Sequence, residues 1–313
     1  MRKGILSDLS PLSKLFFTLF IIVVSFLLLA LIGALLAIPL FGVNFFTNPD
    51  LLDVGLYPES IQVVKYFQII QSLGIFILPP LTAALLFSTQ PFHYLKINQQ
   101  PLLYSFIVSG IIIIASMPLI EYMIQVNEKL ILPEFLSSME QWMKKSEEGR
   151  KEITLAFLNV DSVIGFAVNI FMFGILAAVG EELLFRGIIQ RLLSDWLKNN
   201  HWAIIVAAFL FSALHMQFYG FLPRFILGVF LGYLFLWTRS LWIPIFAHFI
   251  NNASAVTVYY LANIGILKID PEDFGSVDSK FLFFASVMLV FGLLVTIYLK
   301  EKTRRTNTIT LNK

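Results

Sequence analysis

The chain has 313 residues, of which 58% are hydrophobic and only 13% charged, whereas soluble domains carry about 25% charged residues. Its mean hydropathy of +0.81 indicates a membrane protein. The net charge of +2 excludes a strongly basic nucleic-acid-binding protein, and the lack of cysteine excludes disulfides, thiolate catalysis and cysteine-bound metals.

Hydrophobic runs along the chain predict its membrane spans. A transmembrane helix requires about 20 mostly apolar residues, and eight runs are candidates. They cover residues 15–41, 62–88, 102–122, 163–182, 203–217, 223–238, 241–264 and 281–299. The fourth helix is expected to continue to about residue 197, and the fifth and sixth are short. We therefore predict an all-α, polytopic membrane protein with about eight transmembrane helices and an active site inside the helical bundle.

The first two runs carry further signals. The first is too long for the apolar core of a signal peptide, so we interpret it as a retained helix. The proline pair at residues 79–80 predicts a kink or break in the second, because proline removes a backbone donor and clashes with the preceding turn. The second run also carries a polar stripe, expected to face other helices or the interface, formed by Lys65, Gln68, Gln71 and Ser72.

The distribution of charge in the connections predicts the orientation. Basic residues flank both ends of the chain: Arg2, Lys3, Lys14, Lys300, Lys302, Arg304, Arg305 and Lys313. Acidic residues mark the first and last connections: Asp50, Asp53, Glu59, Asp270, Glu272, Asp273 and Asp278. An even number of spans puts both termini on one side of the membrane, and their basic charge predicts that this side is the cytoplasm.

The spans divide the chain into three parts. Residues 1–160 hold three transmembrane helices and an extracytoplasmic insertion at about 122–161. Residues 161–264 form the core that carries the polar constellation described below, and residues 265–313 form the last helix and a basic cytoplasmic tail. Within the insertion, apolar residues at helical spacing after Pro133 predict an amphipathic helix on the outer surface. It could be a simple connector or a gate for substrate.

Four ionisable residues stand out inside the apolar runs of the core. Glu181 and Glu182 interrupt the fourth run, and His215 and His248 lie in the fifth and seventh. An antiparallel hairpin brings Glu181 and His215 to a similar level, since they lie about 25 Å and 20 Å from the turn that joins their helices. Asn252 shares a helix face with His248, four residues earlier. These groups are expected to converge in the cytoplasmic half of the membrane.

The two glutamates are expected to differ in role. Glu182 and Arg186 are four residues apart, so they can form an ion pair along one helix face. Glu181 is rotated by about 100° and remains free for chemistry. On the sixth helix, Gly228 and Gly232 form a Gly-x-x-x-Gly face that favours tight packing, and we interpret Arg224 on the same helix as an interface anchor.

Water activation and acyl transfer fit this set of residues. Glu181 and His215 would position and deprotonate a water, and His248 and Asn252 would donate hydrogen bonds to the oxyanion. Serine-hydrolase and His-Glu-x-x-His motifs do not occur in the sequence. Zinc held by two histidines and a glutamate is the alternative, although compact ligand spacing is lacking. We predict no cofactor.

Three motifs, taken in their order along the chain, resemble those of one protein family. They are Glu-Glu-x-x-x-Arg at 181–186, Phe-x-x-x-His at 211–215 and His-x-x-x-Asn at 248–252. The segment from Phe166 to Asn252 resembles the CPBP family (CAAX proteases and bacteriocin-processing enzymes, also called Abi). The resemblance implies an eight-helix intramembrane endopeptidase with a cavity open to the cytosol and bilayer. It implies that Glu181 and His215 activate water, and that His248 and Asn252 stabilise the oxyanion without metal.

The predicted function is hydrolysis of a peptide bond in a membrane-associated protein or peptide, with the lipid bilayer as the other partner. We expect a bacterial inner-membrane location. One alternative is a non-catalytic immunity or scaffold protein, against which the intact motifs weigh. Another is a proton-coupled transporter, for which buried ionisable groups are equally expected, but the internal repeats typical of transporters are not visible.

Overall fold

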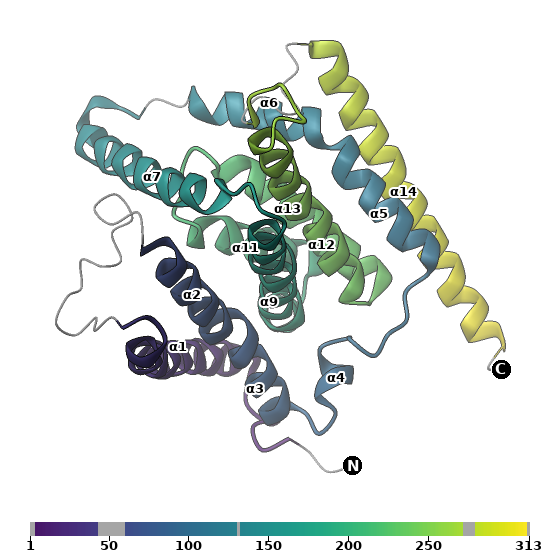
Figure 1. Cartoon of the computed structure of the whole chain (residues 1–313). Coiled ribbons are helices and arrows are strands. Elements are labelled where there is room, and N and C mark those ends of the chain that lie inside the picture. Colours follow the sequence, from purple (N-terminus) through teal and green to yellow (C-terminus); the bar gives the residue numbers. More distant parts are fainter. Residues whose placement is uncertain (1–3, 43–59, 130–131, 272–278, 312–313) are drawn as a thin grey trace.

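The computed structural model describes residues 4–42, 60–129, 132–271 and 279–311. Some charged residues used above to predict orientation lie outside this part of the chain: Arg2, Lys3, Asp50, Asp53, Glu59, Glu272, Asp273, Asp278 and Lys313. The described residues form helices and no strands, which confirms the predicted all-α class (Figure 1).

The helices follow one another with short connections. In the N-terminal half they are α1 (Pro11–Phe41), α2 (Ile61–Ser72), η3 (Leu73–Ile77), α3 (Leu78–Phe87), α4 (Pro91–Tyr94), α5 (Leu103–Ala115), α6 (Met117–Glu128), η4 (Glu134–Leu136) and α7 (Ser137–Leu158). In the C-terminal half they are α8 (Val163–Asn169), η5 (Ile170–Leu176), α9 (Ala177–Glu182), η6 (Leu183–Ile189), α10 (Gln190–Leu197), α11 (Asn200–Leu214), α12 (Phe221–Thr238), α13 (Trp242–Asn263) and α14 (Lys280–Leu311).

Helices lie at all eight predicted positions, but they do not all have the length and composition of a membrane span. Five helices of the described residues do, and the bent pair α5–α6 brings the number to six. The helix α11 is apolar but has only 15 residues, and α13 is not among these candidates. The structure is therefore that of a polytopic membrane protein.

Two predicted spans differ in shape from the expectation. The proline pair at 79–80 does not break its helix, which runs without interruption from Ile61 to Phe87. A π-helical turn, η3, precedes the prolines, and the amide of Leu78 bonds the carbonyl of Leu73 five residues back. Such a wider turn accommodates the proline rings. The third span instead bends by 42° between α5 and α6, where Pro118 stands in the first turn of α6.

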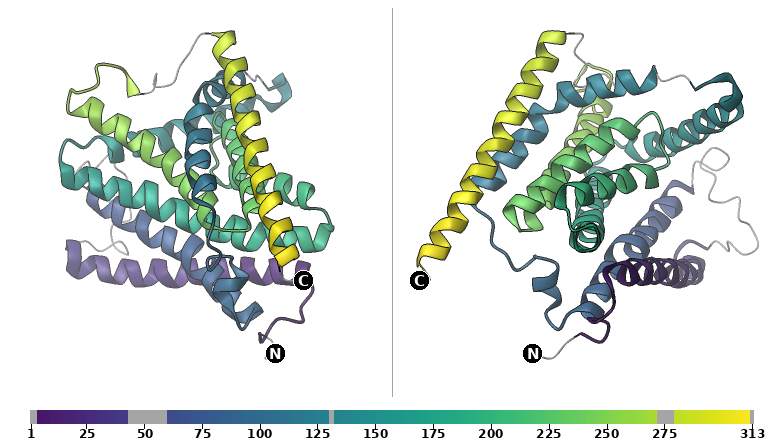
Figure 2. Two further views of the ribbon diagram at one scale, coloured as in Figure 1. Left: turned by 90° about the vertical axis from the view of Figure 1, so that its right-hand side faces the viewer. Right: turned by 180° about the vertical axis from the view of Figure 1, so that it is seen from behind.

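The helix ends form two opposite faces. Both ends of the described chain lie on one of these faces, which we call the basic face (Figures 1 and 2). There the guanidinium of Arg305 at the end of α14 donates to the carbonyl of Trp237 near the end of α12 (2.7 Å), and Ser240 donates to the carbonyl of Gln99 (2.8 Å). The basic face carries Lys14, Lys96, Lys198, Arg239, Lys300 and Lys302.

The helix α7 belongs to the opposite face. It lies far from both chain ends (Figure 1), and its Trp142 ring packs on Phe218 in the α11–α12 connection (centroids 5.5 Å apart). The buried amine of Lys65, near the start of α2, donates to the carbonyl of Phe157 in the last turn of α7 (3.1 Å) and to Asn169 (3.0 Å). The predicted amphipathic helix therefore exists, begins at Ser137 and is fastened to the bundle at its C-terminal end.

Candidate active site

A single long helical segment, residues 163–197, carries both glutamates. Two π-helical turns, η5 and η6, flank its central part α9. Gly180 sits where this segment meets η3, because a Cβ atom there would lie 2.8 Å from the Cβ of Phe76. Glycine before the Glu-Glu pair thus brings the second membrane helix directly against the helix that carries the carboxylates.

Glu182 lies at the centre of a buried ionic cluster. Its Oε1 accepts hydrogen bonds from Nη1 of Arg186 at 2.7 Å and from Nδ1 of His248 at 2.9 Å. The side chains of Glu182 and Arg186 are 0% and 2% exposed. The predicted ion pair is therefore present, and it also orients the His248 ring that packs edge-on against Phe211 (5.9 Å).

The Gly-x-x-x-Gly face of α12 is part of the same cluster. Nη2 of Arg186 donates to the carbonyl of Gly228 (3.0 Å), and Nε2 of Gln190 donates to the carbonyl of Gly232 (3.1 Å). The two donors are four residues apart, and so are the two acceptors. The two bonds therefore link successive turns of η6–α10 and α12. A Cβ at Gly228 would lie 3.0 Å from that of Ala208 in α11, so the glycines also set the α11–α12 distance, as predicted for a packing motif.

Glu181 has a different environment from its neighbour. Its Oε2 is buried without a hydrogen-bond partner among the described residues, and it lies 3.8 Å from Nε2 of His248. The Glu181 side chain is 13% exposed, against 0% for Glu182. The sequence-based expectation of two unequal carboxylates thus matches the geometry: one is held on two sides, and the other has an unused oxygen.

His215 stands at the C-terminal end of α11. Its Nδ1 lies 2.7 Å from the carbonyl oxygen of Phe211, one turn earlier. Because a carbonyl only accepts, Nδ1 carries the proton, and Nε2 of the neutral ring is left with a free lone pair. The ring also packs against the Phe211 side chain (5.0 Å), which fixes its direction.

Glu181 and His215 line one cavity of about 310 Å³. Polar groups on its walls include Gln68 and Gln71 from α2 and Arg150 and Thr154 from α7. The glutamines belong to the predicted polar stripe, which therefore was the sequence signal for this wall. Nothing in the sequence indicated that α7 contributes the other wall, because amphipathic spacing does not reveal what the apolar face covers.

The other two predicted site residues, His248 and Asn252, lie beside this cavity rather than in its lining. Nδ2 of Asn252 donates to the carbonyl of Phe173 (2.8 Å), and its Oδ1 accepts from Asn251 (3.0 Å). One Asn252 N–H remains after these bonds. Phe173 itself lines the cavity, so the amide is anchored at its edge.

Arg224 contributes to the electrostatics of the site. It was expected to anchor the helix at the interface, but its guanidinium donates to the backbone carbonyl of Gln217 (3.3 Å) and to the Gln217 side chain. Its charge is close enough to act on both Glu181 and His215. The sequence separation from Glu181 concealed this contribution.

A zinc site would need several histidine or carboxylate side chains grouped around one point. Within the described ranges, histidine and carboxylate side chains form no group of three that could hold a metal ion. Oε1 of Glu182 and Nδ1 of His248 bond to each other, and Nδ1 of His215 bonds to a backbone carbonyl. These contacts favour hydrogen-bond networks over a ready tetrahedral site.

One family of known proteins matches the part of the chain that carries these residues. Residues 163–254 match the family described as "Type II CAAX prenyl endopeptidase Rce1-like". This segment is therefore similar to the Rce1-like proteins of the CPBP family. All six predicted site residues lie inside the Rce1-like segment.

One curated relative is the "Uncharacterized protein YpbD" of Bacillus subtilis (strain 168), 33% identical over 89 residues. That match covers 27% of this chain and 42% of YpbD. No solved structure matches the chain. The match to YpbD therefore spans less than half of either chain.

Proposed function

We propose that this protein is an intramembrane endopeptidase in which Glu181 activates a water molecule for attack on a peptide bond. The main observation behind this proposal is that Oε2 of Glu181 has no hydrogen-bond partner among the described residues. Glu181 also shares a cavity with His215. The match of the surrounding segment to CAAX prenyl endopeptidases supports the same reaction class. The substrate is a membrane-associated protein or peptide.

The reaction follows from the free atoms of the site. Glu181 takes a proton from water while Nε2 of His215 accepts a hydrogen bond from it, and the hydroxide oxygen bonds to the scissile carbonyl carbon. When the tetrahedral intermediate collapses, the C–N bond breaks and the proton held by Glu181 passes to the leaving amine. The products are a carboxylic acid and an amine, which exchange a proton to become a carboxylate and an ammonium group, and the carboxylate of Glu181 is regenerated.

His248 and Asn252 serve as oxyanion donors in this mechanism. Nδ1–H of His248 is already used by Glu182, so donation from Nε2 requires the imidazolium form. The ring lies between two carboxylates, with Nδ1 at 2.9 Å from Glu182 and Nε2 at 3.8 Å from Glu181. Asn252 supplies the N–H that Phe173 leaves free.

A comparison of membrane proteomes tests the activity. Cells with wild-type protein and cells with Glu181→Gln are compared for membrane peptides that fail to be cleaved, and purified protein in liposomes is then tested on those peptides. Glu140→Gln is the control, because Glu140 pairs with Lys144 (2.7 Å) on α7 and does not line the cavity. Cleavage that persists in Glu181→Gln refutes the mechanism. Solute transport without cleavage would instead support the carrier alternative.

We further propose that substrate reaches Glu181 from the face opposite the basic face. The cavity wall formed by Arg150 and Thr154 belongs to α7, which lies on that opposite face. The helix α11 starts at the basic face and its 15 residues extend for about 22 Å, so His215 at its end lies beyond the middle of a hydrocarbon layer about 30 Å thick.

Under this proposal, two expectations drawn from the sequence about the side of the membrane disagree. Basic connections predict that the basic face is cytoplasmic, whereas the family resemblance implies a cavity open to the cytosol. The access route proposed above puts the two on opposite faces of this chain. Because Lys and Arg residues gather at one face, we propose that the cavity receives an extracytoplasmic segment of its substrate. An export or membrane-insertion reaction must supply that segment.

The cysteine-free sequence makes the access side directly measurable. Thr154→Cys places a single thiol in the cavity wall, and Lys302→Cys places one on the basic face. In intact cells, a membrane-impermeant thiol reagent should label Thr154→Cys, and should label Lys302→Cys only after permeabilisation. The reverse pattern would refute the proposed access side and leave the hydrolase proposal intact, because labelling does not depend on activity.

A further inference from the structure

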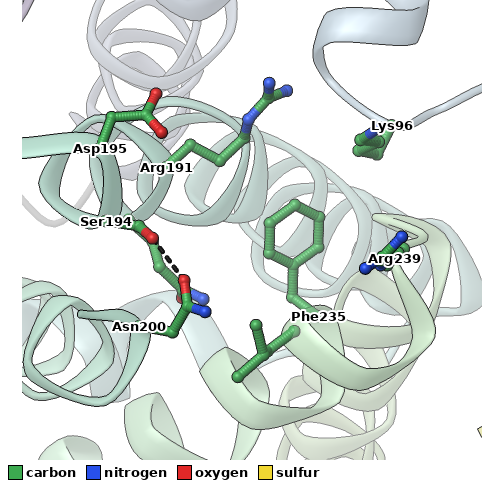
Figure 3. Close-up of a pocket in the computed structure, with 9 residues that line it drawn as sticks. Lys96, Arg191, Ser194, Asp195, Asn200, Phe235 and Arg239 are labelled. Carbon is green, nitrogen blue, oxygen red and sulfur yellow. Dashed lines mark hydrogen bonds between the residues drawn. The ribbon is translucent and has the colours of Figure 1, made fainter. Parts of the chain in front are cut away.

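A second cavity, of about 410 Å³, opens at the basic face. Its walls come from the α10–α11 turn, the end of α12 and the connection that follows α4. Figure 3 shows Lys96, Arg191 and Arg239 around one side of Phe235, with Asp195, Ser194 and Asn200 on the other. Neither the catalytic residues nor the wall of the Glu181 cavity take part in it.

Three cations face this cavity against one carboxylate. Arg191 is held in place by the Tyr94 ring, whose centroid lies 4.2 Å from the guanidinium carbon. Lys96 and Arg239 both stand in the left-handed backbone region, with φ of 61° and 53°. This conformation is unfavourable for residues other than glycine. The two turns therefore hold Lys96 and Arg239 in a strained backbone conformation at the edge of the cavity.

The cations lack full compensation among the described residues. Burial, and then the charges of Arg191 and Arg239, lower the pKa of Lys96, so the three groups repel one another. Nη1 of Arg191 and Oε1 of Gln190, both in residues that line the cavity, are buried without a hydrogen-bond partner. A cavity with uncompensated cations, a free guanidinium N–H and a free acceptor is chemically suited to an anion that also carries a hydroxyl group.

We propose that this cavity binds a phosphate-bearing anion, with Lys96, Arg191 and Arg239 as its ligands and Gln190 as acceptor for a neighbouring hydroxyl. The cavity lies at the membrane border, where the indole of Trp242 donates to the carbonyl of Ile97 (2.7 Å) and marks the interfacial depth. A phosphate ester there is either an anionic lipid headgroup, such as phosphatidylglycerol, or a soluble phosphate.

Binding is tested with the purified full-length protein in nanodiscs. Wild type is compared in phosphatidylcholine alone, in phosphatidylcholine with phosphatidylglycerol, and in phosphatidylcholine with added inorganic phosphate or glycerol phosphate. Thermal unfolding and bound lipid by native mass spectrometry are the readouts. Lys96→Gln and Arg239→Gln should each weaken binding about tenfold or more, whereas Lys300→Gln, another cation of the basic face outside this cavity, should not.

The outcomes separate the possible sources. Stabilisation by phosphatidylglycerol alone identifies a lipid headgroup, and equal stabilisation by the soluble phosphates identifies a soluble ligand. The proposal is overturned if neither raises the unfolding temperature, or if Lys300→Gln weakens binding as much as Lys96→Gln and Arg239→Gln, since the attraction would then be general to the basic face.

Discussion

Replacing the two adjacent glutamates should have opposite consequences for stability. Glu182→Gln leaves Arg186 as a buried cation without its carboxylate, and it also weakens the bond to His248. Both members of the ion pair are almost completely inaccessible to solvent. Loss of one partner of such a pair costs about 3–5 kcal/mol, so the free energy of unfolding should fall by about that amount.

Glu181→Gln should not destabilise the protein. Its Oε2 has no hydrogen-bond partner among the described residues, so the folded state carries an incompletely satisfied buried carboxylate. An uncharged amide removes part of that cost. We expect a free energy of unfolding within about 1 kcal/mol of wild type or higher, together with a loss of about 10²–10⁴ in the rate of cleavage.

The assay is chemical denaturation in mixed micelles, followed by a spectroscopic probe, with wild type, Glu181→Gln and Glu182→Gln measured in parallel. A difference of about 3 kcal/mol or more between the two variants is expected. If both lose stability equally, Glu181 is as firmly bonded in the fold as Glu182. The inference that Glu181 is reserved for chemistry would then be wrong.

Other variants test the packing and the chemistry around this pair. Gly228→Ala should cost about 1–3 kcal/mol, because the new methyl would lie 3.0 Å from that of Ala208; Gly292→Ala, with no described atom within 4 Å of the added Cβ, should instead gain up to about 1 kcal/mol in helix propensity. Unfolding measurements of both variants decide this, and destabilisation of similar size in both would contradict the close contact of α11 and α12. Lys65→Met should lower the free energy of unfolding by about 1.5–3 kcal/mol and make α7 more sensitive to proteolysis, whereas unchanged protection of α7 would refute its anchoring role. Active purified protein should retain its activity after treatment with a chelator, and stoichiometric zinc that disappears together with activity in His215→Ala would sink the metal-free mechanism.

The predictability of the site depended on distance along the chain. The Glu182–Arg186 pair follows from four-residue spacing on one helix, and the structure has it. The depth argument also placed Glu181 and His215 at similar levels, and they share a cavity. The bond from Asn252 to the Phe173 carbonyl was not predictable, because helix periodicity does not specify how one helix is rotated against another.

The surroundings of the site were less accessible from the sequence. The polar stripe of the second span was recognised, but it could equally have faced the membrane interface; Gln68 and Gln71 in fact line the cavity. The tandem prolines signalled a kink or a break; the helix does not break, and a π-helical turn lies just before them. The position of α7 depends on contacts such as that of Lys65 with Phe157, 92 residues apart, and pattern analysis of a single segment does not detect these.

The two hydrogen bonds from Arg186 and Gln190 to the glycine carbonyls of α12 have a mechanical consequence. Sliding or turning α12 along the catalytic helix would break both bonds together and expose a buried guanidinium. That side of the site therefore behaves as a rigid frame. We therefore predict that a movement admitting a peptide occurs at the other wall. There α7 is held to α2 near its C-terminal end, and it contacts the α11–α12 connection through Trp142 and Glu147. We expect the groups bonded to α12 to keep their positions while the wall formed by α7 moves.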